Sequence, residues 1–138
     1  MKPFYLDASA VMKLIFAEPQ SDALKAMIVG RDVAASELLL TEVPRAVHRL
    51  TEGMGPDERR YFFGQAGSTL SHATLLQLDR PTLELAGRFQ QPDLRSLDAI
   101  HVATAVIAGD DLEAFVTYDR RQERAAREAG FEVLAPGL

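Results

Sequence analysis

FYLDASAVMKL, residues 4–14, is the stretch of sequence that decides the fold class. Phe4–Leu6 form a short apolar run that ends at Asp7, and a turn of small residues follows it. Apolar side chains then recur at helical spacing over residues 11–15, with Ser9 as the expected N-cap. This pattern predicts a short buried strand that leads directly into a helix.

The same alternation of strand and helix continues along the chain. Further short apolar runs predict strands at residues 33–35, 75–78, 115–117 and 131–134. Helices are expected over 21–29, 37–50, 56–71, 81–89, 97–108 and 120–129, with caps at Ser21, Ser36 and Ser96 and a kink at Pro44. Short apolar strands that alternate with helices are typical of an α/β fold with a parallel sheet.

Length and composition favour one globular domain over residues 1–138. The chain is 47% hydrophobic and 25% charged, which is ordinary for a folded protein. The absence of cysteine excludes disulfides, thiolate metal sites and thiol catalysis. No apolar run approaches the roughly 20 residues that span a bilayer, so we expect a cytoplasmic protein with no membrane association.

The charge balance bears on the partners of the protein. The net charge of −5 disfavours binding of nucleic acid by bulk charge alone. The 15 basic residues are 12 Arg and 3 Lys, and every basic residue after Lys25 is Arg. Arginine suits bidentate phosphate contacts, although genome composition produces the same bias.

Four carboxylates from distant parts of the chain are expected to meet at one edge of the sheet. Asp7 and Asp119 each follow a predicted strand, and ligands of open parallel sheets bind at the carboxyl ends of the strands. Asp98 begins a predicted helix, and Glu42 lies in the helix after the second strand. Each also has a local interpretation: a cap for Asp7 and Asp119, a helix-start charge for Asp98, and an ion pair with Arg45 for Glu42.

Grouped carboxylates repel one another unless a cation neutralises them. Mg²⁺ prefers carboxylate and water oxygens and works together with substrate phosphate. Such ions activate water and stabilise the attacking and leaving oxygens in phosphoester cleavage. The pattern therefore permits a metal-dependent hydrolase without establishing one, and two bound Mg²⁺ would bring the formal charge of −5 to about −1.

Four segments together resemble the motifs of PIN-domain ribonucleases, in the same order. They are FYLDASAVMKL (4–14), LLLTEVPRAVHRL (38–50), LRSLDAIHVATA (94–105) and FVTYDRRQERAAREAGFEV (115–133). YLDASA and LDAIHVATA are the most specific, and the resemblance covers nearly the whole chain. In particular, the chain resembles the VapC toxins of type II toxin–antitoxin pairs.

The resemblance implies a five-stranded parallel sheet with helices on both faces and endoribonuclease activity that depends on one or two Mg²⁺ or Mn²⁺ ions. It places Asp7, Glu42, Asp98 and Asp119 in the acidic quartet that binds metal and hydrolyses RNA, leaving 5′-phosphate and 3′-hydroxyl ends. Ser9 and Thr117 match positions where small hydroxyl side chains support these carboxylates. A homodimer and a cognate VapB-like antitoxin are also implied. Pro44 departs from the family pattern and puts the direction of Glu42 in question.

Several arginines and one histidine lie near the expected acidic edge. Arg45 and Arg49 share a helix face with Glu42, while Arg120 and Arg124 follow Asp119, and all four are candidates for RNA phosphate contacts. The alternative is that these arginines lie on a solvated helix face with salt bridges. This alternative is favoured for Arg127, because Glu123 lies four residues before it. His101 follows Asp98 by three residues, and we expect it to be packed or hydrogen-bonded rather than a cofactor ligand.

Other functions fit the sequence less well. Receiver domains and haloacid-dehalogenase-type phosphatases use a late lysine, which this chain does not have after Lys25. A dinucleotide-binding module needs a glycine-rich turn after its first strand, where this chain has Ala8–Ser9–Ala10. The remaining alternative is a catalytically weak PIN-fold module that binds RNA or protein.

Overall fold

The strand that leads into a helix at residues 4–15 lies at the centre of the molecule. In a computed structural model, which describes all of residues 1–138, β1 (Phe4–Leu6) is the middle strand of a five-stranded sheet. Its order is β3-β2-β1-β4-β5, and every pairing is parallel. The other strands are β2 (Val33–Ser36), β3 (Thr74–Leu76), β4 (Ala114–Val116) and β5 (Val133–Leu134). This confirms the predicted parallel sheet.

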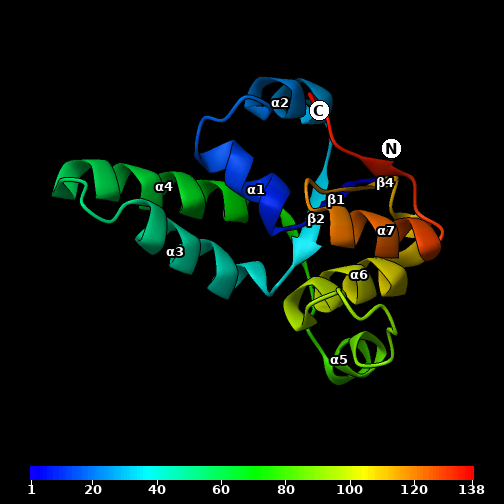
Figure 1. Ribbon diagram of the computed structural model, residues 1–138. Coiled ribbons are helices and arrows are strands. Elements are labelled where there is room, and N and C mark those ends of the chain that lie inside the picture. Colours follow the sequence, from blue (N-terminus) through cyan, green and yellow to red (C-terminus); the bar gives the residue numbers. More distant parts are fainter.

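Helices cover both faces of the sheet, as the sequence predicted. They are α1 (Ala8–Ile15), α2 (Ser21–Ile28), α3 (Leu39–Leu50), α4 (Pro56–Ser71), α5 (Arg80–Ala86), α6 (Ser96–Ala108) and α7 (Arg120–Glu128), with a 3₁₀ turn at Gly109–Asp111. Figure 1 shows α1 and α2 on one side of the central strands and α6 and α7 on the other. The protein is therefore an α/β fold of three layers.

Alternation of side chains along β1 divides the core between the two faces. Phe4 and Leu6 pack into the cluster formed with α1, α2, α3 and α4. Tyr5 points to the opposite face and packs with Phe115 and residues of α6 and α7. All three side chains are buried, because a central parallel strand is covered on both sides.

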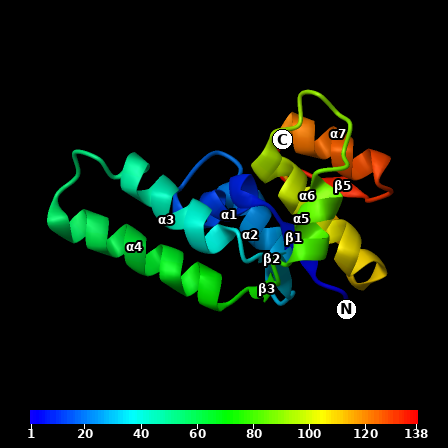
Figure 2. The same ribbon diagram turned by 90° about the horizontal axis from the view of Figure 1, so that it is seen from below.

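Helices α3 and α4 form an arm that projects to one side of the sheet, which both views show (Figures 1 and 2). Phe62 of α4 stacks on Phe16, with ring centroids 4.4 Å apart, and is a partly buried side chain that packs against the core. Tyr61 is exposed on the same helix. None of the helices is both long and apolar enough to cross a membrane.

The expected serine caps were wrong, and the structure shows which groups take their place. Asp7, not Ser9, caps α1 by accepting a hydrogen bond from the Ala10 N–H. Ser36 ends β2, and α3 begins only at Leu39. Ser21 and Ser96 are the first residues of their helices, and Gln20 and Arg95 occupy the cap positions. The serines do lie close to the starts of these helices. In each case, however, the first helical residue is not the one that follows the serine, so another residue occupies the cap position.

Pro44 lies inside α3, and the helix continues through it to Leu50. Proline has no N–H, so the carbonyl of Leu40 loses its partner within the helix. Leu40 is itself an exposed residue. Glu42, which lies two residues before Pro44, is therefore helical. This part of α3 nevertheless has one hydrogen bond fewer than an ordinary helix.

The order of the strands fixes where ligands bind. β1 pairs with β2 on one side and with β4 on the other, so the chain changes direction across the sheet at β1. In open α/β sheets such a switch point leaves a crevice at the carboxyl ends of the strands. Residues 7 and 117–119 follow β1 and β4 at that edge.

Replacing Leu6 with alanine tests the central position of β1. Leu6 is fully buried, so Leu6→Ala should lower the free energy of unfolding by about 2–5 kcal/mol. Urea denaturation followed by circular dichroism measures the change. Leu83→Ala, which removes the same atoms from a half-exposed site on α5, should cost less than about 0.5 kcal/mol. Equal losses for the two variants would contradict the assignment of β1 to the core.

Candidate active site

The fold brings the four carboxylates singled out in the sequence to one edge of the sheet. Asp7 follows β1 directly, and Asp119 follows β4 by three residues. Asp98 lies in the first turn of α6, and Glu42 lies in the first turn of α3. One set of hydrogen bonds runs from Asp7 through Asp119 to Asp98, and a separate chain of hydrogen bonds holds Glu42.

Asp7 is fully buried, and neutral groups bind both of its carboxylate oxygens. Oδ1 accepts hydrogen bonds from the Ser9 hydroxyl at 2.7 Å and from the Ala10 N–H at 3.0 Å. Oδ2 accepts one from the Thr117 hydroxyl at 2.6 Å. Burial raises the pKa of Asp7 above its ordinary value, and His101 and these three donors offset part of that rise. The carboxylate therefore serves both as a cap and as a buried negative charge.

Thr117 and Ser9 connect Asp7 to the loop after β4. The Thr117 hydroxyl accepts a hydrogen bond from the Asp119 N–H at 3.0 Å while donating to Asp7. The Ser9 hydroxyl accepts one from the Tyr118 N–H at 3.0 Å while donating to Asp7. These two hydroxyls therefore fix the ends of β1 and β4 relative to each other.

Gln122 joins Asp119 to Asp98. Asp119 caps α7, because its Oδ1 accepts from the Arg121 N–H at 2.9 Å and from the Gln122 N–H at 3.0 Å. The Gln122 side chain then donates to Asp98 Oδ1 at 3.0 Å. Gln122 was not among the site residues predicted from the sequence, although its position was a signal: it is a polar residue on the buried stripe of α7 that Ala125 and Ala126 continue.

Glu42 is held from the opposite face of the sheet by His101. The His101 Nε2 and Glu42 Oε1 atoms lie 2.6 Å apart, and the Tyr5 hydroxyl lies 2.8 Å from His101 Nδ1. His101 is therefore buried and hydrogen-bonded, as expected for a histidine that is not a cofactor ligand. Glu42 forms no ion pair with Arg45, so the local interpretation of Glu42 was wrong.

No lysine or arginine forms a salt bridge with any of the four acids, and only His101 contacts one of them as a potential cation. Two of these acids repel the charge of Asp98. Partial burial and the neighbouring charge of Asp119 raise the pKa of Asp98, with a smaller contribution from Glu42. The edge is therefore a site of uncompensated negative charge.

The donor set fits a hard divalent cation that retains water. No three Asp, Glu or His side chains lie close enough to enclose an ion by themselves. Mg²⁺ is usually held by only one or two carboxylates, with waters and substrate phosphate completing its shell. The Oδ2 atoms of Asp98 and Asp119 accept no hydrogen bond from the protein, and the buried Oε1 of Gln122 has no partner. None of these three oxygens has a hydrogen-bond donor within the protein.

Arginines line hollows on both sides of the acidic edge. A hollow of about 510 Å³ between α1 and α3 includes Glu42, Arg45 and Arg49. A wider one of about 770 Å³ at the start of α7 includes Asp119 and the three arginines Arg120, Arg121 and Arg124. Arg45, Arg49 and Arg120 form no salt bridge, whereas Arg124 pairs with Asp93 and Arg127 with Glu123. The salt-bridged interpretation therefore holds for Arg127 and also applies to Arg124.

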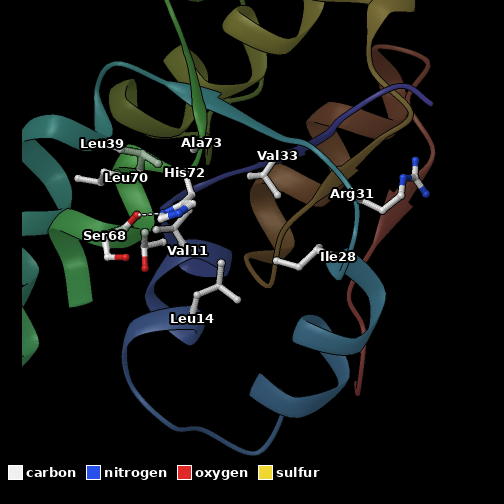
Figure 3. A pocket seen from close by; sticks show the side chains of 11 residues that line it. Val11, Leu14, Ile28, Arg31, Val33, Leu39, Ser68, Leu70, His72 and Ala73 are labelled. Carbon is white, nitrogen blue, oxygen red and sulfur yellow. Dashed lines mark hydrogen bonds between the residues drawn. The ribbon is translucent and has the colours of Figure 1, made fainter. Parts of the chain in front are cut away.

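A separate pocket lies between α1, α2 and the C-terminal end of α4 (Figure 3). Its volume is about 300 Å³, and apolar side chains such as Val11, Leu14 and Ile28 form most of its wall. His72 contacts the Ser68 carbonyl at 2.7 Å inside it. None of the four carboxylates lines this pocket, so it is not part of the acidic edge.

Comparison with known proteins identifies close relatives. The PIN domain family matches residues 4–128. Ribonuclease VapC46 of Mycobacterium tuberculosis is 41% identical over 137 residues, which cover 99% of each chain. Ribonucleases VapC47 and VapC35 of the same species are 36% and 37% identical, and each alignment covers 96% of both chains.

The Asp98→Asn substitution tests the repulsion among the acids. The pKa of Asp98 is raised on folding, so its charge destabilises the native state above that pKa and has no such effect below its unfolded pKa of about 4. In EDTA at pH 7, Asp98→Asn should therefore melt at a higher temperature than the wild type. The difference should disappear as the pH falls towards 4. Asn can still accept the hydrogen bond from Gln122.

The control is Asp111→Asn, the same change at an exposed residue before β4, at the opposite edge of the sheet. Asp111→Asn should leave the melting temperature nearly unchanged. Lower stability of Asp98→Asn in EDTA at pH 7 would show that the four acids do not form a repulsive cluster.

Proposed function

The chain belongs to the PIN-domain family, and from this membership and the geometry of its acidic edge we propose that it is a divalent-metal-dependent endoribonuclease. Residues 1–138 form one such domain in this proposal. Three relatives that align over nearly their whole length carry the name ribonuclease VapC. The protein accordingly acts as the toxin of a VapBC-type pair.

One observation carries the proposal: four carboxylates meet at the switch point of the sheet without a lysine or arginine to neutralise them. They are Asp7, Glu42, Asp98 and Asp119, and neutral donors hold three of the four. A site of this kind costs stability, since its charges repel one another. A cation that offsets this cost explains why the charges are gathered.

We assign the cation as Mg²⁺ or Mn²⁺, with one or two ions bound. When bound, such an ion lowers the pKa of water and stabilises charge on the phosphodiester oxygens. Asp98 and Asp119 would offer their free Oδ2 atoms to it, and Gln122 would offer Oε1 to the ion or to a water. Mn²⁺ shares the preference of Mg²⁺ for oxygen ligands, so the same residues serve either ion.

The protein residues around the acids supply orientation. Ser9, Thr117 and the Ala10 N–H hold Asp7 in one rotamer, and the helix dipole of α1 favours its negative charge. Gln122 fixes the distance between Asp98 and Asp119. Such preorganisation lowers the cost of arranging charge around the phosphodiester during cleavage.

The arginines beside the acids would bind the phosphates of the RNA strand. Arg45 and Arg49 line the hollow that includes Glu42, and Arg120 and Arg124 line the one that includes Asp119. Arg124 would have to break its salt bridge with Asp93 to bind a phosphate. The other three arginines form no salt bridge that would have to break. A strand lying in both hollows would pass along the acidic edge between them.

A toxin of this type requires an inhibitor, and we propose a VapB-like antitoxin as its partner. The acidic edge lacks a cation of its own and so is a receptor for an arginine from such a protein. We further propose that the chain forms a homodimer and acts in the cytoplasm, where its RNA substrates are. Exposed apolar side chains such as Leu50 and Tyr61 on the α3–α4 arm are available for contacts between subunits.

Cleavage of RNA tests the activity. Purified protein with Mg²⁺ or Mn²⁺ should cut total RNA into discrete fragments with 5′-phosphate and 3′-hydroxyl ends, and EDTA should abolish the cutting. Asp98→Asn should reduce the rate at least about 100-fold because it removes one charge from the set that binds the cation. The control is Asp111→Asn, which should cleave as the wild type does. Equal cleavage by Asp98→Asn would overturn the assignment, and a folded wild type that cuts no RNA would favour a catalytically weak PIN-fold binding module.

Replacing Arg45 and Arg49 with alanine tests the phosphate contacts. The double variant should bind single-stranded RNA more weakly, and the slope of log affinity against log salt should fall by about 0.7 for each phosphate that the protein no longer neutralises. Fluorescence anisotropy in EDTA measures binding without cleavage. Arg60→Ala, on the outer face of α4 beside Asp57, is the matched control and should leave the slope unchanged. An unchanged slope in the double variant would remove these arginines from the RNA path.

A further inference from the structure

Tyr5, His101 and Glu42 form a hydrogen-bonded chain that crosses the sheet. The Tyr5 hydroxyl lies 2.8 Å from His101 Nδ1, and His101 Nε2 lies 2.6 Å from Glu42 Oε1. Tyr5 and His101 are almost completely buried, and Glu42 lies at the surface end of the chain. The three residues come from β1, α6 and α3, so the chain links both layers of helices to the central strand.

The hydrogen atoms in this chain can be assigned from the chemistry of its members. An ionised carboxylate only accepts hydrogen bonds, so His101 Nε2 must carry the proton that lies between it and Glu42. Burial raises the pKa of Tyr5 well above its ordinary value, and the charge of Asp7 adds to this effect. Tyr5 therefore keeps its proton, and its hydroxyl group stays hydrogen-bonded to Nδ1 of His101.

Glu42 depends on this bond more than Asp7 and Asp119 depend on any single donor. The side chain of Glu42 forms no hydrogen bond except the one from His101. Asp7 and Asp119, by contrast, each accept from at least two donors, and backbone N–H groups of their own helices are among them. Glu42 also lies on α3 two residues before Pro44, in the stretch that lacks one helical hydrogen bond.

We propose that His101 is the positioning residue for Glu42: with its ring fixed by Tyr5, its Nε2–H holds Glu42 Oε1 and directs Oε2 towards the acidic edge. The hydrogen bond itself is independent of activity, whereas its consequence for a divalent cation rests on the function proposed above. A partner that orients a metal-binding carboxylate raises metal affinity, and losing one typically costs 10–100-fold.

The state of His101 in the wild-type protein provides the first test. Nitrogen-15 NMR of the imidazole in the metal-free protein should show Nε2 bonded to hydrogen, with a through-bond coupling or a slowed exchange of that proton. Tyr5→Phe removes only the hydroxyl and should weaken this signature by freeing Nδ1. An Nε2 atom without hydrogen in the wild type would overturn the proposal, whatever the enzymatic activity.

Affinity for Mn²⁺, measured by calorimetry in the absence of RNA, provides the second test. His101→Leu should weaken Mn²⁺ binding about 10-fold or more. His101→Gln, whose amide can still donate to Glu42, should recover most of that affinity, and Tyr5→Phe should show a smaller loss than His101→Leu. Rescue by glutamine is a result that a merely structural role for His101 would not give.

Val102→Ala is the matched control for packing. Val102 is the next residue of α6 and is fully buried, but it forms no part of the chain to Glu42. This variant should lose stability and keep the Mn²⁺ affinity of the wild type. A His101→Leu protein that binds Mn²⁺ as the wild type does would overturn the proposal. If His101→Leu does not fold, His101→Gln and Tyr5→Phe decide the question.

The two proposals fail in different ways. Wild-type protein that binds no Mn²⁺ and cleaves no RNA would overturn the proposed function, while a protonated Nε2 would still support the hydrogen bond to Glu42. Conversely, active enzyme with an unprotonated Nε2 would keep the function and overturn the role of His101.

Discussion

The buried carboxylate of Asp7 is the constraint on which the acidic edge depends. A charge with no exposed surface needs a donor for each of its oxygens, and Asp7 obtains them from the first turn of α1 and from Thr117 after β4. The second of these bonds crosses from one strand end to the next. Satisfying one charge therefore aligns β1, α1 and the loop after β4, and this alignment sets the position of Asp119.

Neutral donors, rather than lysine or arginine, hold the rest of the edge together. Thr117 forms hydrogen bonds with both the Asp7 carboxylate and the backbone N–H of Asp119. Gln122 forms hydrogen bonds with both Asp119 and Asp98. Ammonium or guanidinium groups in these places would orient the same acids but would cancel their charge. With hydroxyl and amide donors the carboxylates keep their negative charge, at the cost of the repulsion that raises the pKa of Asp98. A framework of neutral donors suits a site whose cation arrives from solution.

The layers of the fold contribute unequally to the edge. Asp7, Asp98 and Asp119 are anchored by groups on or beside the central sheet, whereas Glu42 comes from the projecting α3–α4 arm. His101 of α6 connects Glu42 to the rest of the fold through a hydrogen bond, and Tyr5 of β1 in turn holds His101. Because Arg45 and Arg49 follow Glu42 on the same helix, the hold on Glu42 also connects the acids with the hollow proposed to receive RNA.

The sequence by itself determined the fold class, the parallel sheet and the edge at which Asp7 and Asp119 lie, because hydrophobic periodicity and the end of a strand are local properties. It also placed His101 near the site, from its spacing to Asp98, and favoured a packed or hydrogen-bonded side chain there. It misplaced the caps at Ser9, Ser21, Ser36 and Ser96, and it did not find Gln122. Only the tertiary structure decided that His101 reaches Glu42, 59 residues away, and Tyr5, 96 residues away. The physical reason is that such partners are chosen by the crossing of strands and helices in space, which no local pattern of side chains records.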